Sequence, residues 1–355
     1  MERPASVAEV ERLAEAVLSP ESHAYIAGAA GAERTLRWNL EAFSRIRLRP
    51  RVLVDVGGVT TETTVLGTPI SLPVLVAPVA FQWLANQDEK ELGMARAAAA
   101  AGTVMCVSTL ATATPEEVAA AAPGRSLWYQ VYVYRDRGVS DELVARALAA
   151  GYSALVLTVD LPVVGIRERE RTTGFSVPEE HVPAARLARE RGGAESDSLH
   201  LLDPTLDWAY LEELCARSPV PVLVKGILTA EDAELACRHG VAGIVVSNHG
   251  GRQLYGAIAS IDALPEVVEA VGERAEVLVD GGVRRGTDVV AALALGARAV
   301  LVGRLAVYGL VVGGEEGVRH VLAILRYETA NALALLGCCS PDEVSREHVA
   351  TIPSL

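Results

Sequence analysis

The sequence predicts an α/β protein folded as a single (β/α)8 TIM barrel, and three observations lead to this fold class. From residue 74 onward, short apolar and β-branched runs alternate with Ala-rich helical patterns, which is typical of parallel βαβ units. Eight such runs are present, mostly spaced by roughly 20 to 35 residues, as in a TIM barrel. The chain has 355 residues and is 50% apolar, which suits one barrel or two ordinary domains, and the eightfold repeat favours the barrel.

Each predicted strand is a short apolar run, and the segments between them are helical patterns in which Glu or Arg interrupts the Ala runs. In chain order the predicted strands are Val74–Ala77, Val104–Val107, Leu127–Val131, Ala154–Thr158, Val222–Val224, Gly243–Val246, Val277–Val279 and Ala299–Val302.

Residues 1–73 precede the first barrel strand, and we expect them to form an N-terminal helical cap. Val7–Leu18 has a helical pattern, and Ser22–Phe43 contains helical segments around Gly28 and Gly31. We expect this cap to pack on the barrel, so that residues 1–355 make one domain.

The fourth and fifth predicted strands are too far apart for one βα unit. The intervening residues 168–205 are charged, contain glycine and show no periodicity, so we predict a long, mobile loop there. A loop that follows the carboxyl end of the fourth strand lies over the face where barrel enzymes keep their active sites.

Composition excludes some partners and favours a compartment. Acidic residues outnumber basic ones by 45 to 32, a net charge of −13, which disfavours nucleic acid and anionic membranes. The five cysteines show no CxxC spacing, and an odd count fits no complete disulfide framework. We assign no metal site. No secretion signal or spanning apolar segment is recognised, so we expect a cytoplasmic protein.

Polar residues follow the predicted strands and predict an active site on one rim of the barrel. The segments DGGVRRG (280–286) and VGR (302–304) follow the seventh and eighth strands. Their glycines, the following helix N-terminus, and Arg284 or Arg304 are suited to a phosphate group. The alternative is two tight turns with solvated arginines.

His249 is the candidate catalytic base, because it stands three residues before Arg252 at a strand end. An imidazole can take a hydroxyl proton, and a guanidinium binds a carboxylate bidentately. Asp160 could stabilise the imidazolium that forms. Lys225 could stabilise negative charge on a reduced flavin. The alternatives are a structural histidine and a lysine that reaches the solvated rim.

Several motifs together resemble the FMN-dependent 2-hydroxy-acid oxidase and dehydrogenase family, which includes glycolate oxidase, lactate oxidase and mandelate dehydrogenase. They are SNHGGRQL, DGGVRRGTD followed by ALALGARAVLVGR, APVAFQ, and QVYVYRDR with LTVD. The resemblance extends from about Tyr25 to His348 and covers nearly the whole chain.

The resemblance implies an FMN cofactor and a role for each matching residue. His249 would take the α-hydroxyl proton with Asp160 as its partner, and Tyr132 would hydrogen-bond the hydroxyl or keto oxygen. The substrate carboxylate would be bound by Arg167, Arg252 and Tyr25. Lys225 would face flavin N1 and O2. The residues implied around the isoalloxazine are Pro78, Val79, Ala80, Ser108, Gln130, Thr158 and Ser247, and those implied for the ribityl phosphate are Asp280, Gly282, Arg284, Gly303 and Arg304.

Leu110 departs from the family pattern, because glycolate and lactate oxidases carry Trp or Tyr there. A smaller apolar side chain predicts a roomier pocket for a bulky or aromatic (S)-2-hydroxy acid of the mandelate or 4-hydroxymandelate type. A lactate or glycolate substrate is the alternative.

We expect O2 as the electron acceptor, because the chain has no room for an N-terminal haem domain and its loop after the fourth strand carries Arg186, Arg189 and Arg191. A dehydrogenase with another acceptor is the alternative. The resemblance to this family implies a homotetramer.

Three other functional interpretations of the sequence are alternatives to this family. A type 2 isopentenyl-diphosphate isomerase or an IMP-dehydrogenase-like enzyme would share the phosphate loops, but His249, Arg252 and Tyr132 speak against both. A non-catalytic phosphate- or flavin-binding barrel is expected to lack some of these residues. The vicinal pair Cys338–Cys339 is assigned no role.

Overall fold

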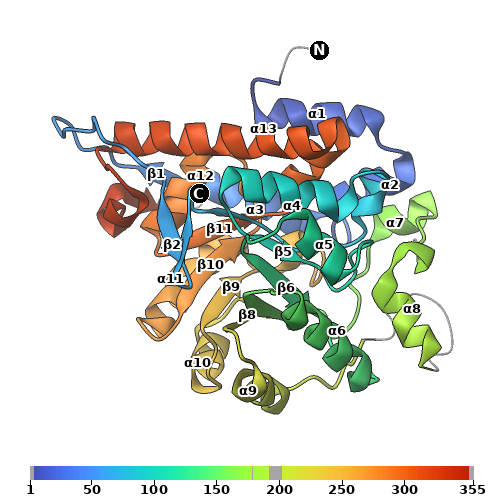
Figure 1. Ribbon diagram of the computed structural model, residues 1–355. Coiled ribbons are helices and arrows are strands. Elements are labelled where there is room, and N and C mark those ends of the chain that lie inside the picture. Colours follow the sequence, from blue (N-terminus) through green and yellow to red (C-terminus); the bar gives the residue numbers. More distant parts are fainter. Residues whose placement is uncertain (1–3, 178, 192–201, 352–355) are drawn as a thin grey trace.

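The computed structural model describes residues 4–177, 179–191 and 202–351, and these form a closed parallel barrel with helices around it (Figure 1). Neighbouring strands pair in chain order, and β11 closes the barrel against β4. The barrel strands are β4 (Val74–Val76), β5 (Met105–Val107), β6 (Leu127–Val131), β7 (Ala154–Thr158), β8 (Val222–Ile227), β9 (Gly243–Val246), β10 (Glu276–Asp280) and β11 (Ala299–Val302). The predicted (β/α)8 TIM barrel is therefore confirmed.

The barrel strands are apolar on both faces, because one face packs inward and the other packs against helices. A separate apolar cluster fills the interior, and Leu75, Trp128 and Leu278 belong to it. The helices along the barrel are α4 (Lys90–Ala101), α5 (Pro115–Ala121), α6 (Arg137–Ala149), α9 (Trp208–Arg217), α10 (Ala230–Arg238), α11 (Ser260–Val271), α12 (Gly286–Ala294) and α13 (Arg304–Leu336).

The first part of the N-terminal cap is helical, as predicted. It contains α1 (Val7–Val17), α2 (Pro20–Ala27) and α3 (Arg34–Ser44). Helix α1 lies along the long helix α13 (Figure 1). The amide of Ala30 donates to the carbonyl of Gly251 at 2.9 Å, so the segment between α2 and α3 contacts the loop after β9.

The prediction of a wholly helical cap over residues 1–73 is wrong for its second half. Residues after α3 form the strands β1 (Ile46–Leu48), β2 (Thr63–Val65) and β3 (Thr68–Ile70). Val65 and Ile70 pack into the interior cluster of the barrel, and the amide of Leu66 donates to Glu276 at the start of β10. The β2–β3 hairpin therefore closes the amino-terminal end of the barrel.

The predicted irregular loop after β7 also contains helices. They are α7 (Glu168–Thr173), a 3-10 turn at Glu179–His181, and α8 (Pro183–Glu190). Helix α8 is held by its buried alanines Ala184, Ala185 and Ala188. The prediction of an irregular chain is wrong for these residues, while positions 178 and 192–201 lie outside the described residues. Mobility of this segment stays a prediction.

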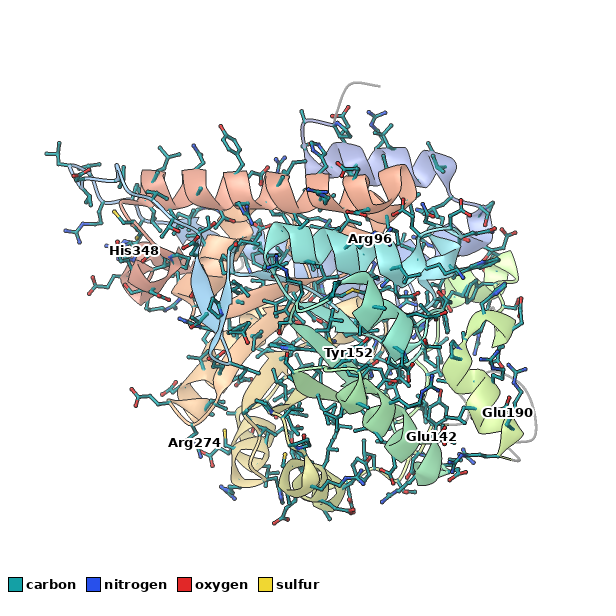
Figure 2. All side chains as sticks on the ribbon, viewed as in Figure 1. Arg96, Glu142, Tyr152, Glu190, Arg274 and His348 are labelled. Atoms are coloured by element: carbon teal, nitrogen blue, oxygen red, sulfur yellow. The ribbon has the colours of Figure 1, made fainter. Side chains whose placement is uncertain are left out.

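Charged side chains cover the outer helices, as Arg96 on α4 and Glu142 on α6 illustrate (Figure 2). Arg96 bonds to Glu315 of α13 at 2.6 Å, which ties two helices together on the outside of the barrel. Within the described part of the chain, no helix combines the length and the apolar character needed to cross a bilayer.

Candidate active site

The predicted site residues gather around one cavity at the carboxyl-terminal rim of the barrel. All but two of them line it, and the exceptions are Asp160 and Ser247. Those two lie directly behind the lining, because Asp160 bonds to His249 and Ser247 accepts from Lys225 at 2.8 Å. The rim therefore brings together residues that are distributed along the sequence between Tyr25 and Val307.

His249 stands between an acid and a phenol. Its Nδ1 atom lies 2.8 Å from Oδ1 of Asp160, and its Nε2 atom lies 3.4 Å from the hydroxyl of Tyr132. Burial lowers the pKa of His249, while the nearby Asp160 carboxylate opposes this effect. The imidazole is thus neutral near neutral pH and can accept a proton.

The backbone of His249 is strained, with a φ of 60°. Left-handed backbone costs a non-glycine residue about 1 to 3 kcal/mol, so surrounding contacts must hold it in place. The His249 amide donates to Ser247 Oγ at 3.0 Å, and the ring contacts described above fix the side chain. Two residues further on, a Cβ on Gly251 would lie 2.7 Å from the Leu36 backbone nitrogen, so a larger residue there would force the chain to shift.

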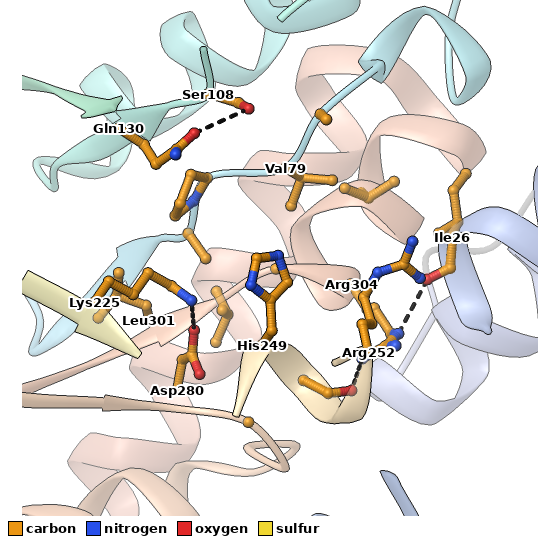
Figure 3. A pocket seen from close by; sticks show the side chains of 18 of the residues that line it. Ile26, Val79, Ser108, Gln130, Lys225, His249, Arg252, Asp280, Leu301 and Arg304 are labelled. Carbon is orange, nitrogen blue, oxygen red and sulfur yellow. Dashed lines mark hydrogen bonds and ion pairs between the residues drawn. The ribbon is translucent and has the colours of Figure 1, made fainter. Parts of the chain in front are cut away.

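Lys225 and Asp280 form a buried ion pair near the barrel axis (Figure 3). The Nζ atom lies 2.9 Å from Oδ2 of Asp280. Burial disfavours the charged form of Lys225. The carboxylates of Asp280 and Asp160 more than offset this effect and raise the pKa of Lys225, so the side chain is a fixed cation. Strand β8 continues to Ile227 with an irregularity after Lys225. The prediction that this strand ends before Lys225 is therefore corrected.

Arg167 is buried, and Arg252 is largely buried beside the ring of Tyr25. The Arg252 guanidinium lies 4.7 Å from the ring centroid of Tyr25, and its Nη1 atom donates to the Tyr25 and Gly28 carbonyls at 2.6 and 2.8 Å. Arg167 is 7% exposed, and its Nε atom is buried with no hydrogen-bond partner among the described residues. The cavity wall therefore holds two cations suited to a carboxylate.

Three further buried polar atoms on the cavity wall have no partner within the described structure. They are Gln130 Nε2, Thr158 Oγ1 and Asp280 Oδ1. Buried polar groups are normally hydrogen-bonded, so these atoms indicate a polar ligand. The carbonyl oxygen of the Gln130 side chain already accepts from Ser108 and the Thr109 amide (Figure 3). Its amide group is therefore directed elsewhere, as a flavin ring with polar edges requires.

The other end of the cavity is cationic and closely approached by backbone. Arg284 and Arg304 line it beside Gly282 and Gly303, and α13 begins at Arg304. Arg304 donates to the carbonyls of Ile26, Gly250 and Gly28 at 3.0, 3.0 and 2.6 Å, which leaves two of its five N–H groups for a ligand. Burial lowers its pKa to about 10, so it remains charged at neutral pH.

A family model described as FMN-dependent dehydrogenase matches residues 14–351 of this chain. The chain belongs to this family. The buried polar atoms of the cavity wall that have no partner among the described residues fit the isoalloxazine of FMN, and the cationic, glycine-lined end fits its phosphate. It is accordingly an oxidoreductase of the FMN-dependent 2-hydroxy-acid oxidase family.

Curated relatives and solved structures agree with this assignment. The L-lactate oxidase of Nostoc sp. is 48% identical over an alignment of 357 positions that covers 96% of this chain and 96% of its own. Glycolate oxidase 1 of Zea mays is 46% identical over 98% of this chain and 95% of its own. A crystal structure of mandelate oxidase superposes with a TM-score of 0.92 and is 42% identical, covering 99% of this chain and 100% of that one.

Some residues near this FMN-dependent site were not singled out from the sequence. Phe81 and Phe175 both pack against the Tyr25 ring, with ring centroids 5.3 and 4.7 Å away. Glu170 contacts Arg167 and Arg252. The only sequence signal for Glu170 is its position three residues after Arg167, which also suits a solvated charged helix.

Proposed function

We propose that this chain oxidises an (S)-2-hydroxy acid with a bulky or aromatic side chain, of the mandelate or 4-hydroxymandelate type, to the 2-oxo acid. The observation that carries this proposal is the contact of neutral His249 with both Asp160 and Tyr132 in a cavity that also holds two buried arginines. A base beside a carboxylate site is what this reaction needs.

Substrate binding begins with its carboxylate. Arg167 and Arg252 bind the carboxylate, and the Nε–H of Arg167, which has no partner among the described residues, supplies one donor. Tyr25 assists, since burial raises the pKa of its phenol and keeps the hydroxyl protonated as a donor. This anchoring directs the α-carbon toward the flavin side of the cavity and the α-hydroxyl toward His249.

Proton transfer is the task of His249. Its Nδ1–H is donated to Asp160, so the Nε2 lone pair is free to take the α-hydroxyl proton. Burial opposes ionisation of Asp160, but its hydrogen bond with His249 and the Lys225 charge keep its pKa low, so the carboxylate then stabilises the imidazolium. Tyr132 donates a hydrogen bond to the oxygen that becomes the keto group.

When bound, FMN would supply the acceptor for the α-hydrogen, which leaves the α-carbon together with its bonding electron pair. Lys225 would hold a positive charge toward the pyrimidine edge of the ring and stabilise the negative charge of the reduced cofactor. Pro78, Val79 and Ala80, which line the cavity, would contact the ring, and Ser247 accepts from the Lys225 ammonium at 2.8 Å.

The substrate class rests on the apolar side of the cavity. Leu110 lines the cavity, and its carbonyl accepts from the amide of Phe81 at 3.1 Å. A leucine leaves more room for a side chain than Trp or Tyr. Solved mandelate oxidase structures, including one with (S)-2-phenylpropionate at a TM-score of 0.90, resemble this chain throughout.

The second candidate substrate is L-lactate, because the Nostoc sp. relative named L-lactate oxidase is 48% identical. Measurement of kcat/KM for (S)-mandelate, L-lactate and glycolate with the same FMN-loaded preparation separates the candidates. The proposal requires mandelate to be the best of the three. A clear preference for L-lactate or glycolate would replace the aromatic substrate class while leaving the chemistry unchanged.

We propose O2 as the acceptor, with H2O2 as the second product, because the curated relatives are named oxidases. Stoichiometric H2O2 formation during turnover in air supports this acceptor, whereas turnover only with an added dye would indicate a dehydrogenase. A homotetramer and a cytoplasmic location stay predictions from the family resemblance and the cysteine pattern.

A further inference from the structure

Glu170 bridges the two arginines of the carboxylate site. Its Oε1 atom lies 3.1 Å from Nη2 of Arg252 and 3.5 Å from Nη1 of Arg167. The three side chains are 15%, 12% and 7% exposed, so solvent screens these contacts only partly. Glu170 belongs to α7, the short helix that follows the loop after β7.

Glu170 contacts one particular edge of each guanidinium group. Nη1 of Arg252 already donates to two backbone carbonyls, and Nη2 donates to Glu170. Arg167 meets Glu170 through Nη1, on the edge away from its Nε–H, and that Nε atom is buried without a partner in the described structure. The edge of Arg167 that contains Nε therefore remains available to a ligand.

The two guanidinium groups also repel each other. Burial is the main cause that lowers the pKa of Arg252, and the neighbouring Arg167 charge lowers it further, while Glu170 acts in the opposite direction. Two adjacent buried cations stay close only when a negative or strongly accepting group lies between them. Glu170 is such a group in the absence of substrate.

We propose that Glu170 is a positioning residue that holds Arg167 and Arg252 in the geometry that binds the substrate carboxylate. This inference rests on the proposed function, because it assigns the two arginines to the substrate. Glu170 acts through both guanidinium groups and takes no part in proton or electron transfer. Its effect is therefore on binding and much less on the chemical step.

A competing role for the same contact predicts the opposite change in carboxylate affinity when Glu170 is removed. If Glu170 occupied the place of the substrate carboxylate, its removal would strengthen the binding of carboxylates. The free Nε edge of Arg167 favours the positioning role, since a competitor would be expected to cover that edge.

The test compares Glu170→Ala with wild type as FMN-loaded proteins. Phenylglyoxylate and pyruvate, two 2-oxo acid probes, are titrated into the oxidised enzymes, and the change in flavin absorbance gives Kd. We expect Kd for both probes to rise about tenfold, with KM rising similarly and kcat changing less than about threefold. Glu168→Ala is the matched control, because Glu168 is an exposed acid on the same helix. It should leave Kd unchanged.

Two further variants distinguish positioning from a general structural effect. Glu170→Gln keeps an acceptor oxygen on a side chain of the same length and should retain most of the affinity that Glu170→Ala loses. In an Arg167→Met background, Glu170→Ala should cost clearly less than in wild type, because the two residues act together. Tighter binding by Glu170→Ala, equal losses in both backgrounds, or no recovery by Glu170→Gln would each overturn the proposal. If neither probe perturbs the wild-type flavin, the proposed substrate class itself fails.

Discussion

The Nδ1 atom of His249 lies 2.8 Å from Oδ1 of Asp160, and the other ring nitrogen faces the Tyr132 hydroxyl at 3.4 Å. Because Asp160 only accepts when ionised, this contact places the ring proton on Nδ1. The lone pair of Nε2 then points into the cavity. The pair thus fixes both the tautomer and the orientation of the base.

Asp160→Asn removes the charge that raises the pKa of His249 and stabilises its protonated form. We expect kcat with a 2-hydroxy acid to fall by about 10²-fold, within the usual range for acid–base partners. Since burial already lowers the pKa of His249 below 6.5, the acidic limb of kcat/KM should move to still lower pH. A pH profile from pH 4 to 9 measures both effects. An acidic limb displaced toward higher pH would contradict this account.

Lys225→Met removes the cation that we propose for the pyrimidine edge of the flavin and leaves Asp280 without its ion-pair partner. We expect the reduction potential of bound FMN to become more negative and the anaerobic reduction rate to fall by at least about tenfold. The free energy of unfolding should decrease by about 3 to 5 kcal/mol. Ser247→Ala keeps the Lys225 cation but removes the acceptor for Lys225 and for the His249 amide, and it should change the potential much less. An unchanged potential in Lys225→Met would be inconsistent with its proposed place.

Leu110→Trp narrows the apolar side of the cavity. The ratio of kcat/KM for mandelate to that for L-lactate should fall about tenfold or more, because a bulky substrate side chain loses space that a methyl group does not need. Leu335→Trp is a suitable control, since Leu335 is 69% exposed on α13. A rise in the mandelate to lactate ratio would mean that the side chain lies elsewhere in the cavity.

Gly282→Ala should prevent normal FMN binding. Gly282 has a φ of 89°, and a Cβ there would lie 2.1 Å from the Asn39 carbonyl oxygen. The backbone must therefore shift, at a cost of about 1 to 3 kcal/mol or more. Fluorescence titration of the apoprotein with FMN should show at least tenfold weaker binding, while Gly58→Ala, which meets nothing within 4 Å, should bind normally. Equal FMN affinity of the two variants would refute the assigned cradle.

The barrel could be predicted because its signals are strong and local. A buried parallel strand is apolar on both faces, and the chain repeats that run eight times. The β2–β3 hairpin was missed because its strands are only three residues long and give no clear alternation. Helices α7 and α8 were missed for a similar reason, since six and eight residues rich in charge resemble a loop.

Much of the candidate site followed from motifs, but its contacts did not. Strand ends identified His249, Lys225 and Asp280, since parallel strands bring their carboxyl ends to one rim. The role of Glu170 depends on two guanidinium groups separated by 85 residues in the chain, Arg167 and Arg252, and no local pattern encodes that meeting. The strained backbone at His249 likewise has no signal in residue type.

The most direct test of the central claim is an anaerobic absorption spectrum of the FMN-loaded protein with (S)-mandelate, followed by admission of air. We predict loss of the oxidised flavin band at about 450 nm on addition of substrate and return of the band in air. Bleaching without return would retain the 2-hydroxy-acid chemistry and exclude O2 as the acceptor. An oxidised band that persists with (S)-mandelate, L-lactate and glycolate would contradict the account.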